Sequence, residues 1–197
     1  MNEAHRLRLD PIATPDRLLL GPGPSNADPR VLQAIARPPL SHLDPLYLEL
    51  MNEVQEMLRY AWQTENRFTI PVSGTGSAAM EATIANTVEA GETVVVGVIG
   101  YFGKRLVDMC GRYGAKVVEV SAPWGEALSL DTLTQAVEQH KPAVLALVHA
   151  ETSTGVQQPL DGIGDLCRAH DCLLLLDTVT SLGGVPLKLD EAKVDLA

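Results

Sequence analysis

Three apolar runs, each followed directly by polar or glycine-rich sequence, constrain the fold of this chain more than any other feature. They are TVVVGVI at residues 93–99, AVLALV at 143–148 and CLLLL at 172–176. Short runs this rich in Val, Leu and Ile are typical of strands that are buried on both faces, as in parallel sheets. Because such strands need a layer of helices on each side, the runs predict an α/β fold with a doubly wound, mostly parallel sheet and flanking helices.

The segments between the runs complete this strand–helix alternation. Further short strands are expected at residues 67–72 (RFTIPV) and 116–120. Helices are expected over residues 29–36, 45–63, 77–88, 102–113, 131–140 and 161–170. The N-terminal sequence has a different character, with an apolar stub and a Gly-Pro-Gly-Pro turn at residues 21–24. We therefore expect an N-terminal arm over residues 1–25, followed by one large domain over residues 26–197.

Composition excludes several classes of function. The 197 residues include 15 basic and 25 acidic side chains, a net charge of −10, and no basic cluster, which argues against a nucleic-acid partner. The first ten residues include four charged side chains and no apolar signal-peptide core, and no apolar stretch approaches the ~18 residues of a membrane span. Three cysteines, Cys110, Cys167 and Cys172, have no metal-ligand spacing and predict buried thiols in a reducing compartment. The expectation is a cytoplasmic protein without a metal site or a membrane partner.

Doubly wound sheets bind ligands beyond the carboxyl ends of their strands, so the polar segments there are the candidate sites. The first is SGTGSAAME at residues 73–81. A glycine turn that leads into a helix exposes backbone N–H groups at the positive end of the helix dipole, and can hold a phosphate. Gly74, Gly76 and Ala79 also fit a dinucleotide fingerprint, and an ordinary glycine turn is a further explanation. Gly100 stands where a dinucleotide site prefers an acidic residue, which counts against a dinucleotide.

Three more segments follow the other strands. Phe102 opens the helix after residues 93–99, where an aromatic ring can stack on a planar ligand or pack in the core. Residues 149–155 (HAETSTG) concentrate hydroxyl groups and one carboxylate, as a ligand site or a capped turn does. Asp177 ends a run of four leucines, where a carboxylate must be paired or take part in chemistry. A protonated pyridine nitrogen is one partner that would satisfy it; capping of the next turn is the other explanation.

Taken together and in this order, the segments resemble those of the class V pyridoxal-phosphate-dependent aminotransferases of fold type I. Within that class, they are most similar to the alanine–glyoxylate and serine–glyoxylate aminotransferase group. The resemblance extends from Leu18 to Ala197. Its motifs are LLLGPGPS, SGTGSAAMEA, GYFGKR, HAETSTGVQQPLDGIG and LLLLDTVTSLGGVPLKLDEAKVDLA. It implies that the chain is the N-terminal portion of such an enzyme, with a cofactor-binding large domain over residues 26–197.

The resemblance also implies which residues bind pyridoxal 5′-phosphate. The phosphate would be held by Thr75, Gly76 and Ser77. Phe102 would stack on one face of the pyridine ring and Val179 would press on the other. Thr152 would hydrogen-bond the phenolic oxygen of the ring.

Catalysis in the family implies further roles. Asp177 would be catalytic, because pairing with the pyridine nitrogen keeps it protonated and makes the ring an electron sink. Gly23 would lie near the substrate carboxylate. The Schiff-base lysine is expected in a Ser-Gly-x-Gln-Lys segment beyond Ala197, as is the small C-terminal domain, so the 197 residues alone are expected to lack turnover. Lys188 and Lys193 are expected to face water and not to replace that lysine.

The implied function is transamination between a small amino acid, alanine or serine, and glyoxylate or a similar oxoacid, in a homodimer. One alternative is a truncated, non-catalytic fragment that binds cofactor or serves in assembly. Another is a NAD-dependent oxidoreductase, which depends on the glycine pattern at residues 74–79 alone.

Overall fold

The structure is a computed structural model that describes residues 12–197, and the chain divides into two compact units, residues 1–39 and residues 40–197. The first eleven residues of the predicted arm lie outside the described residues. The predicted boundary at residue 25 stays a prediction. In the described residues, no helix is long and apolar enough to cross a membrane.

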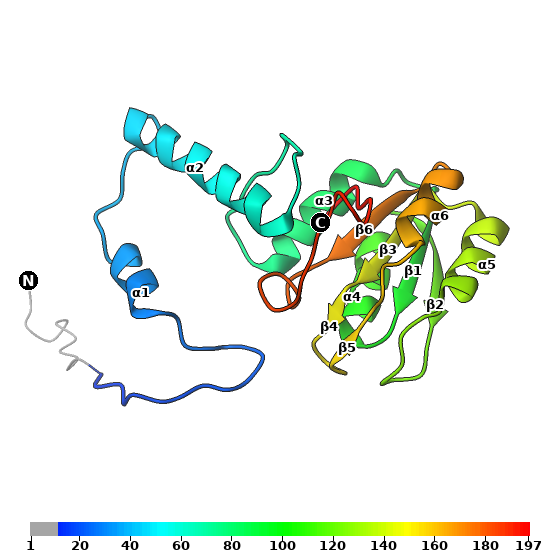
Figure 1. Ribbon diagram of the computed structural model, residues 1–197, viewed down its shortest axis with the longest axis horizontal. Helices are drawn as coiled ribbons and strands as arrows, with labels where there is room; N and C mark the ends of the chain where they lie inside the picture. Colours follow the sequence, from blue (N-terminus) through cyan, green and yellow to red (C-terminus); the bar gives the residue numbers. More distant parts are fainter. Residues whose placement is uncertain (1–11) are drawn as a thin grey trace, which may run out of the picture. The chain divides into compact units, whose positions relative to one another are not determined.

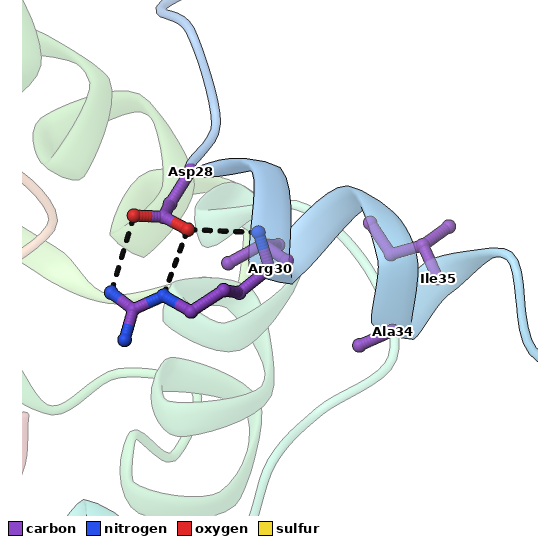
Figure 2. Close-up of a pocket in the computed structure, with 5 residues that line it drawn as sticks. Asp28, Arg30, Ala34 and Ile35 are labelled. Carbon is purple, nitrogen blue, oxygen red and sulfur yellow. Dashed lines mark hydrogen bonds and ion pairs between the residues drawn. The ribbon is translucent and has the colours of Figure 1, made fainter.

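Residues 12–39, the described part of the first unit, contain one short helix, α1 (Pro29–Ile35). Asp28 is its N-cap and accepts hydrogen bonds from the Arg30 backbone N–H at 2.8 Å and from Arg30 Nε at 3.0 Å (Figure 2). Pro29 follows at the first helical position, where its missing N–H is not needed. None of the residues of α1 is buried, and its apolar side chains, Val31, Leu32 and Ile35, are exposed.

The second unit contains the predicted sheet and helices (Figure 1). The helices are α2 (Pro45–Trp62), α3 (Gly76–Thr87), α4 (Tyr101–Arg112), α5 (Leu130–His140) and α6 (Ile163–Ala169). The main strands are β1 (Thr93–Val98), β2 (Lys116–Ser121), β3 (Val144–Val148) and β6 (Leu173–Asp177). These strands form one sheet in the order β2-β1-β3-β6, and every neighbouring pair is parallel.

Alternate residues of the strands enter two separate cores, one on each face of the sheet. In β1, Val94 and Val96 pack with side chains of α3 and α4, whereas Val95 packs with side chains of α5 and α6. The same alternation separates Leu175 from its neighbours Leu174 and Leu176 in β6. Each fully buried Val or Leu contributes roughly 1.5–3 kcal/mol relative to an exposed one. The predicted doubly wound, mostly parallel sheet with flanking helices is confirmed.

Residues 67–72 correct one expectation, because they do not form a strand. Their apolar side chains are exposed, Phe68 by 80%. No strand of the described part of the chain pairs with this segment, and a strand cannot persist without a ladder partner. The free edge of β6 is bonded to Leu196 and not to residues 67–72: Leu176 N donates to Leu196 O at 2.8 Å.

A second difference lies after β3. The polar segment at residues 149–157 is not simply a turn but a small antiparallel hairpin of β4 (Ala150–Glu151) and β5 (Val156–Gln157). The hairpin follows the carboxyl end of β3, beside the end of β1. β1 lies between β2 and β3 in the sheet, so the strand that follows β1 in sequence is its neighbour on one side, and the next strand is its neighbour on the other side. This reversal of strand order is where a crevice for a ligand forms in such sheets.

Candidate functional site

A cavity of about 150 Å³ lies at the carboxyl edge of the sheet, on the side of α3 and α4. It is lined by all seven residues predicted to bind the cofactor: Thr75, Gly76, Ser77, Phe102, Thr152, Asp177 and Val179. The remaining lining residues are Met80, Arg105, Leu106, Met109, Val148 and Thr180. Four separate segments, far apart in the sequence, therefore meet around one cavity.

The start of α3 forms one end of the site. Thr75 is the N-cap, and its hydroxyl makes no capping hydrogen bond within the described residues. Within the described residues the N–H groups of Gly76 and Ser77 make no hydrogen bond, whereas Ala78 N donates to Thr75 O at 2.9 Å. The helix dipole places positive charge at this end. Gly76 is required by close packing, because a Cβ atom at this position would lie 2.7 Å from Val179 Cγ2. The result is a set of free donors suited to an anionic group.

Arg105 adds a cation at the same end of the cavity. Its Nη2 donates a hydrogen bond to Ser77 Oγ at 2.9 Å, so the guanidinium of α4 contacts the first turn of α3. Sequence reasoning did not identify Arg105 as a site residue. Its position three residues after Phe102 was the available signal, because residues at this spacing share one face of a helix. Backbone N–H groups, hydroxyls and a guanidinium together match the chemistry of a phosphate.

Hydroxyl groups and two apolar side chains line the middle of the site. Thr152 Oγ1 is hydrogen-bonded to Thr180 Oγ1, and Thr180 is a second lining residue that sequence reasoning missed. Phe102 is half-buried in the first turn of α4. Val179 is 70% exposed, two residues beyond the end of β6. An aromatic ring, a branched aliphatic side chain and a hydroxyl pair suit a flat, partly polar ligand.

Among the described residues, Asp177 provides the only carboxylate that lines this cavity. It is the last residue of β6, opposite Val148 of β3, and its Oδ1 accepts a hydrogen bond from Val179 N at 3.0 Å. Burial raises the pKa of Asp177, and so does the negative charge of Glu151, whereas the Val179 N–H and the positive charge of Arg105 lower it. A charged carboxylate is thus unfavourable here, and a bound cation would relieve that cost.

The comparison with known proteins identifies the family. Residues 18–197 match the family described as aminotransferase class-V. The chain belongs to this family. It is 45% identical over 188 residues to the alanine–glyoxylate aminotransferase of Drosophila melanogaster, covering 95% of this chain and 48% of the relative.

Two solved structures of this kind are also similar. The alanine–glyoxylate aminotransferase of Nostoc sp. has 65% identity and a TM-score of 0.95, with 99% of this chain and 52% of that chain covered. The ureidoglycine–glyoxylate aminotransferase of Bacillus subtilis has 39% identity and a TM-score of 0.92, with 93% and 48% covered. The chain thus spans about half the length of its relatives. The predicted class V resemblance and the fold type I large domain are confirmed, and the dinucleotide interpretation is left without support.

Gly23, Lys188 and Lys193 were also named from the sequence. Gly23 belongs to the first unit, so its role near a substrate carboxylate stays a prediction. Lys188 pairs with Glu191 at 2.8 Å, and Lys193 pairs with Asp165. Neither lysine lines the cavity. Both lysines are engaged in ion pairs at least partly exposed to water, as their alternation with apolar residues predicts.

Proposed function

We propose that this chain is the cofactor-binding part of a pyridoxal-phosphate-dependent aminotransferase. The reaction is transamination between a small amino acid, alanine or serine, and glyoxylate or a similar oxoacid. The observation that carries the proposal is the cavity itself, which has anion donors at the start of α3 and a buried carboxylate, Asp177, at the end of β6. When bound, pyridoxal phosphate supplies an electron-accepting pyridine ring for this chemistry.

The residues at the start of α3 bind and orient the phosphate. Gly76 and Ser77 offer first-turn N–H groups, and the hydroxyls of Thr75 and Ser77 add further donors. Arg105, which already contacts Ser77, neutralises the anion.

Asp177 holds a proton on the ring nitrogen. One oxygen of its carboxylate accepts a hydrogen bond from Val179 N, which leaves the other oxygen to accept one from a ligand. Ionised Asp177 is stabilised by a protonated pyridine nitrogen, and each favours the charged form of the other. Phe102 and Val179 exclude water from the two faces of the ring, and Thr152 donates to its phenolic oxygen.

The substrate class is drawn from the names of the relatives. The fly and Nostoc proteins are named for alanine and glyoxylate, and the Bacillus subtilis protein for ureidoglycine and glyoxylate. Glyoxylate is common to these names, which favours it as the acceptor here. The Schiff-base lysine, the substrate-binding small domain and the role of Gly23 belong to the same proposal, because this chain spans about half of its relatives.

A homodimer in the cytoplasm fits the same proposal. The apolar side chains of α2 are broadly exposed, among them Leu46 at 53%, Met57 at 58% and Tyr60 at 79%. Exposed apolar surface of this extent favours burial against a second copy of the chain. Three buried free thiols, Cys110, Cys167 and Cys172, favour a reducing compartment.

The proposal is tested by calorimetric titration of the chain with deoxypyridoxine phosphate. This cofactor analogue lacks the aldehyde, so it does not react with surface lysines. We expect saturable binding at one site, with much weaker binding of unphosphorylated deoxypyridoxine. Absence of saturable binding, or equal affinity for the two analogues, would contradict the proposal.

A further inference from the structure

Glu151 is a buried carboxylate that has no part in the reaction proposed above. Its side chain lies in β4 and is only 1% exposed. Its two oxygens accept four hydrogen bonds. Oε2 accepts from Phe102 N at 3.0 Å and Gly103 N at 3.2 Å, and Oε1 accepts from Ser153 N at 3.1 Å and Ser153 Oγ at 2.7 Å.

These bonds cap a helix from a distant part of the chain. The N-cap of α4 is Gly100, which has no side chain to offer. The first N–H groups of a helix need partners from outside it. Ser153 Oγ accepts from Tyr101 N at 2.9 Å, so Glu151 and Ser153 together satisfy three consecutive N–H groups. A negative charge at this end also interacts favourably with the helix dipole.

Gly100 leaves the space that this contact requires. A Cβ atom at position 100 would lie 2.4 Å from Glu151 Cγ and 2.6 Å from Glu151 Cδ. Both distances are far inside van der Waals contact, and Glu151 is enclosed on all sides. Any larger residue at position 100 would therefore push the carboxylate away from the helix. The glycine and the carboxylate form one structural unit.

Glu151 also lies between two sides of the cofactor cavity. Thr152, the next residue, lines the cavity from the hairpin side. Phe102, whose own N–H donates to Glu151, lines it from α4, and so does Arg105 one turn later. One carboxylate therefore links the backbone of Phe102, which lines the cavity from α4, to the hairpin that carries Thr152.

We propose that Glu151 is a positioning residue for the cofactor ring. It fastens the first turn of α4 to the β4–β5 hairpin and so sets the place of Phe102 relative to Thr152. This role rests on the proposed function, since the ring it positions is that of pyridoxal phosphate.

The test uses Glu151→Ala and Glu151→Gln, with Glu119→Gln as the matched control. Glu119 of β2 is an exposed carboxylate that pairs with the Lys104 side chain of α4, whereas the N–H groups of residues 101–103 donate to Ser153 and Glu151. Gln at position 151 keeps one oxygen for Phe102 N and Gly103 N and loses the acceptor for Ser153 N. The measurements are amide hydrogen exchange at residues 101–103 without ligand, and the circular dichroism that the chain induces in bound deoxypyridoxine phosphate.

We expect exchange at residues 101–103 to be at least roughly tenfold faster in Glu151→Ala, with Glu151→Gln between it and the unaltered chain. The induced dichroism falls in the same order, because it reports how the ring is held. Glu119→Gln changes neither measurement. If Glu151→Ala does not fold, Glu151→Gln against Glu119→Gln decides the question.

Unchanged exchange in the Glu151 variants would overturn the proposal, and so would faster exchange with unchanged dichroism. Failure of the unaltered chain to bind the analogue is a different result. It would contradict the proposed function and the role of Glu151 toward the ring, while the exchange data would still decide whether Glu151 holds α4.

Discussion

Arg105 of α4 and Ser77 of α3 are joined by a 2.9 Å hydrogen bond between Nη2 and Oγ. The bond brings a guanidinium to the end of the cavity where, within the described residues, the N–H groups of Gly76 and Ser77 make no hydrogen bond. Positive charge is thereby concentrated at one end of the site, and in residues 12–197 the carboxylate of Asp177 is the only acidic side chain that lines it. This separation of charge matches a ligand with an anionic tail and a cationic ring nitrogen.

Replacement of Arg105 should weaken phosphate binding selectively. Arg105→Gln removes the cation, and we expect about a tenfold to hundredfold loss of affinity for deoxypyridoxine phosphate, as for the loss of a charge-assisted hydrogen bond. Affinity for unphosphorylated deoxypyridoxine should stay the same. Arg112→Gln is the control, because Arg112 lies on the same helix and pairs with Asp108 at the surface. An equal loss for both analogues would mean that Arg105 does not act on the phosphate.

Two glycine substitutions should change stability in opposite directions. A Cβ atom at Gly97 of β1 would lie 2.4 Å from Leu147 Cδ2 and 2.8 Å from Leu128 Cδ1, both in the core. Gly97→Ala should therefore lower the free energy of unfolding by about 1–3 kcal/mol. Gly111 in α4 has open space around it, and Gly111→Ala should raise stability by about 0.5–1 kcal/mol. Urea denaturation measures the free energy of unfolding of both variants. A Gly97→Ala variant as stable as the unaltered chain would refute the packing described for β1.

His149 should make the protein less stable in mild acid. It is 3% exposed, its Nδ1 has no hydrogen-bond partner in the part of the chain that the structure describes, and burial lowers its pKa. A lowered pKa means that the unfolded chain binds the proton first, so stability is lost as pH falls through the ordinary histidine pKa of about 6.5. We expect the free energy of unfolding to decline below that pH and His149→Gln to reduce the decline. Identical pH profiles for both proteins would rule out this role.

Asp177 should lower the stability of the ligand-free protein at neutral pH. Because burial raises its pKa, the folded state favours the protonated form, and stability is lost as pH rises from the unfolded pKa through the folded pKa. Asp177→Asn keeps an acceptor for Val179 N and removes the charge. We expect a higher melting temperature at neutral pH for the ligand-free variant and no gain in strong acid. A lower melting temperature at neutral pH would contradict the described burial of the carboxylate.

The buried strands were predictable because burial on both faces leaves a continuous apolar run, as at residues 143–148. The segment at residues 67–72 carries Phe68, Ile70 and Val72 at the alternation of a strand, but a strand also needs a partner, and local sequence does not specify one. The same limit applies to the site. Asp177 follows its strand directly and was identifiable, whereas Arg105 and Glu151 act through contacts with residues far away in the sequence.

The central claim is that Asp177 keeps the ring nitrogen of the bound cofactor protonated. The most direct measurement is the ¹⁵N chemical shift of ring-labelled deoxypyridoxine phosphate, bound to the unaltered chain and to Asp177→Asn at neutral pH. The account predicts a protonated ring nitrogen in the first complex and a neutral one in the second. A neutral nitrogen in the unaltered chain, or the same shift in both complexes, would contradict it.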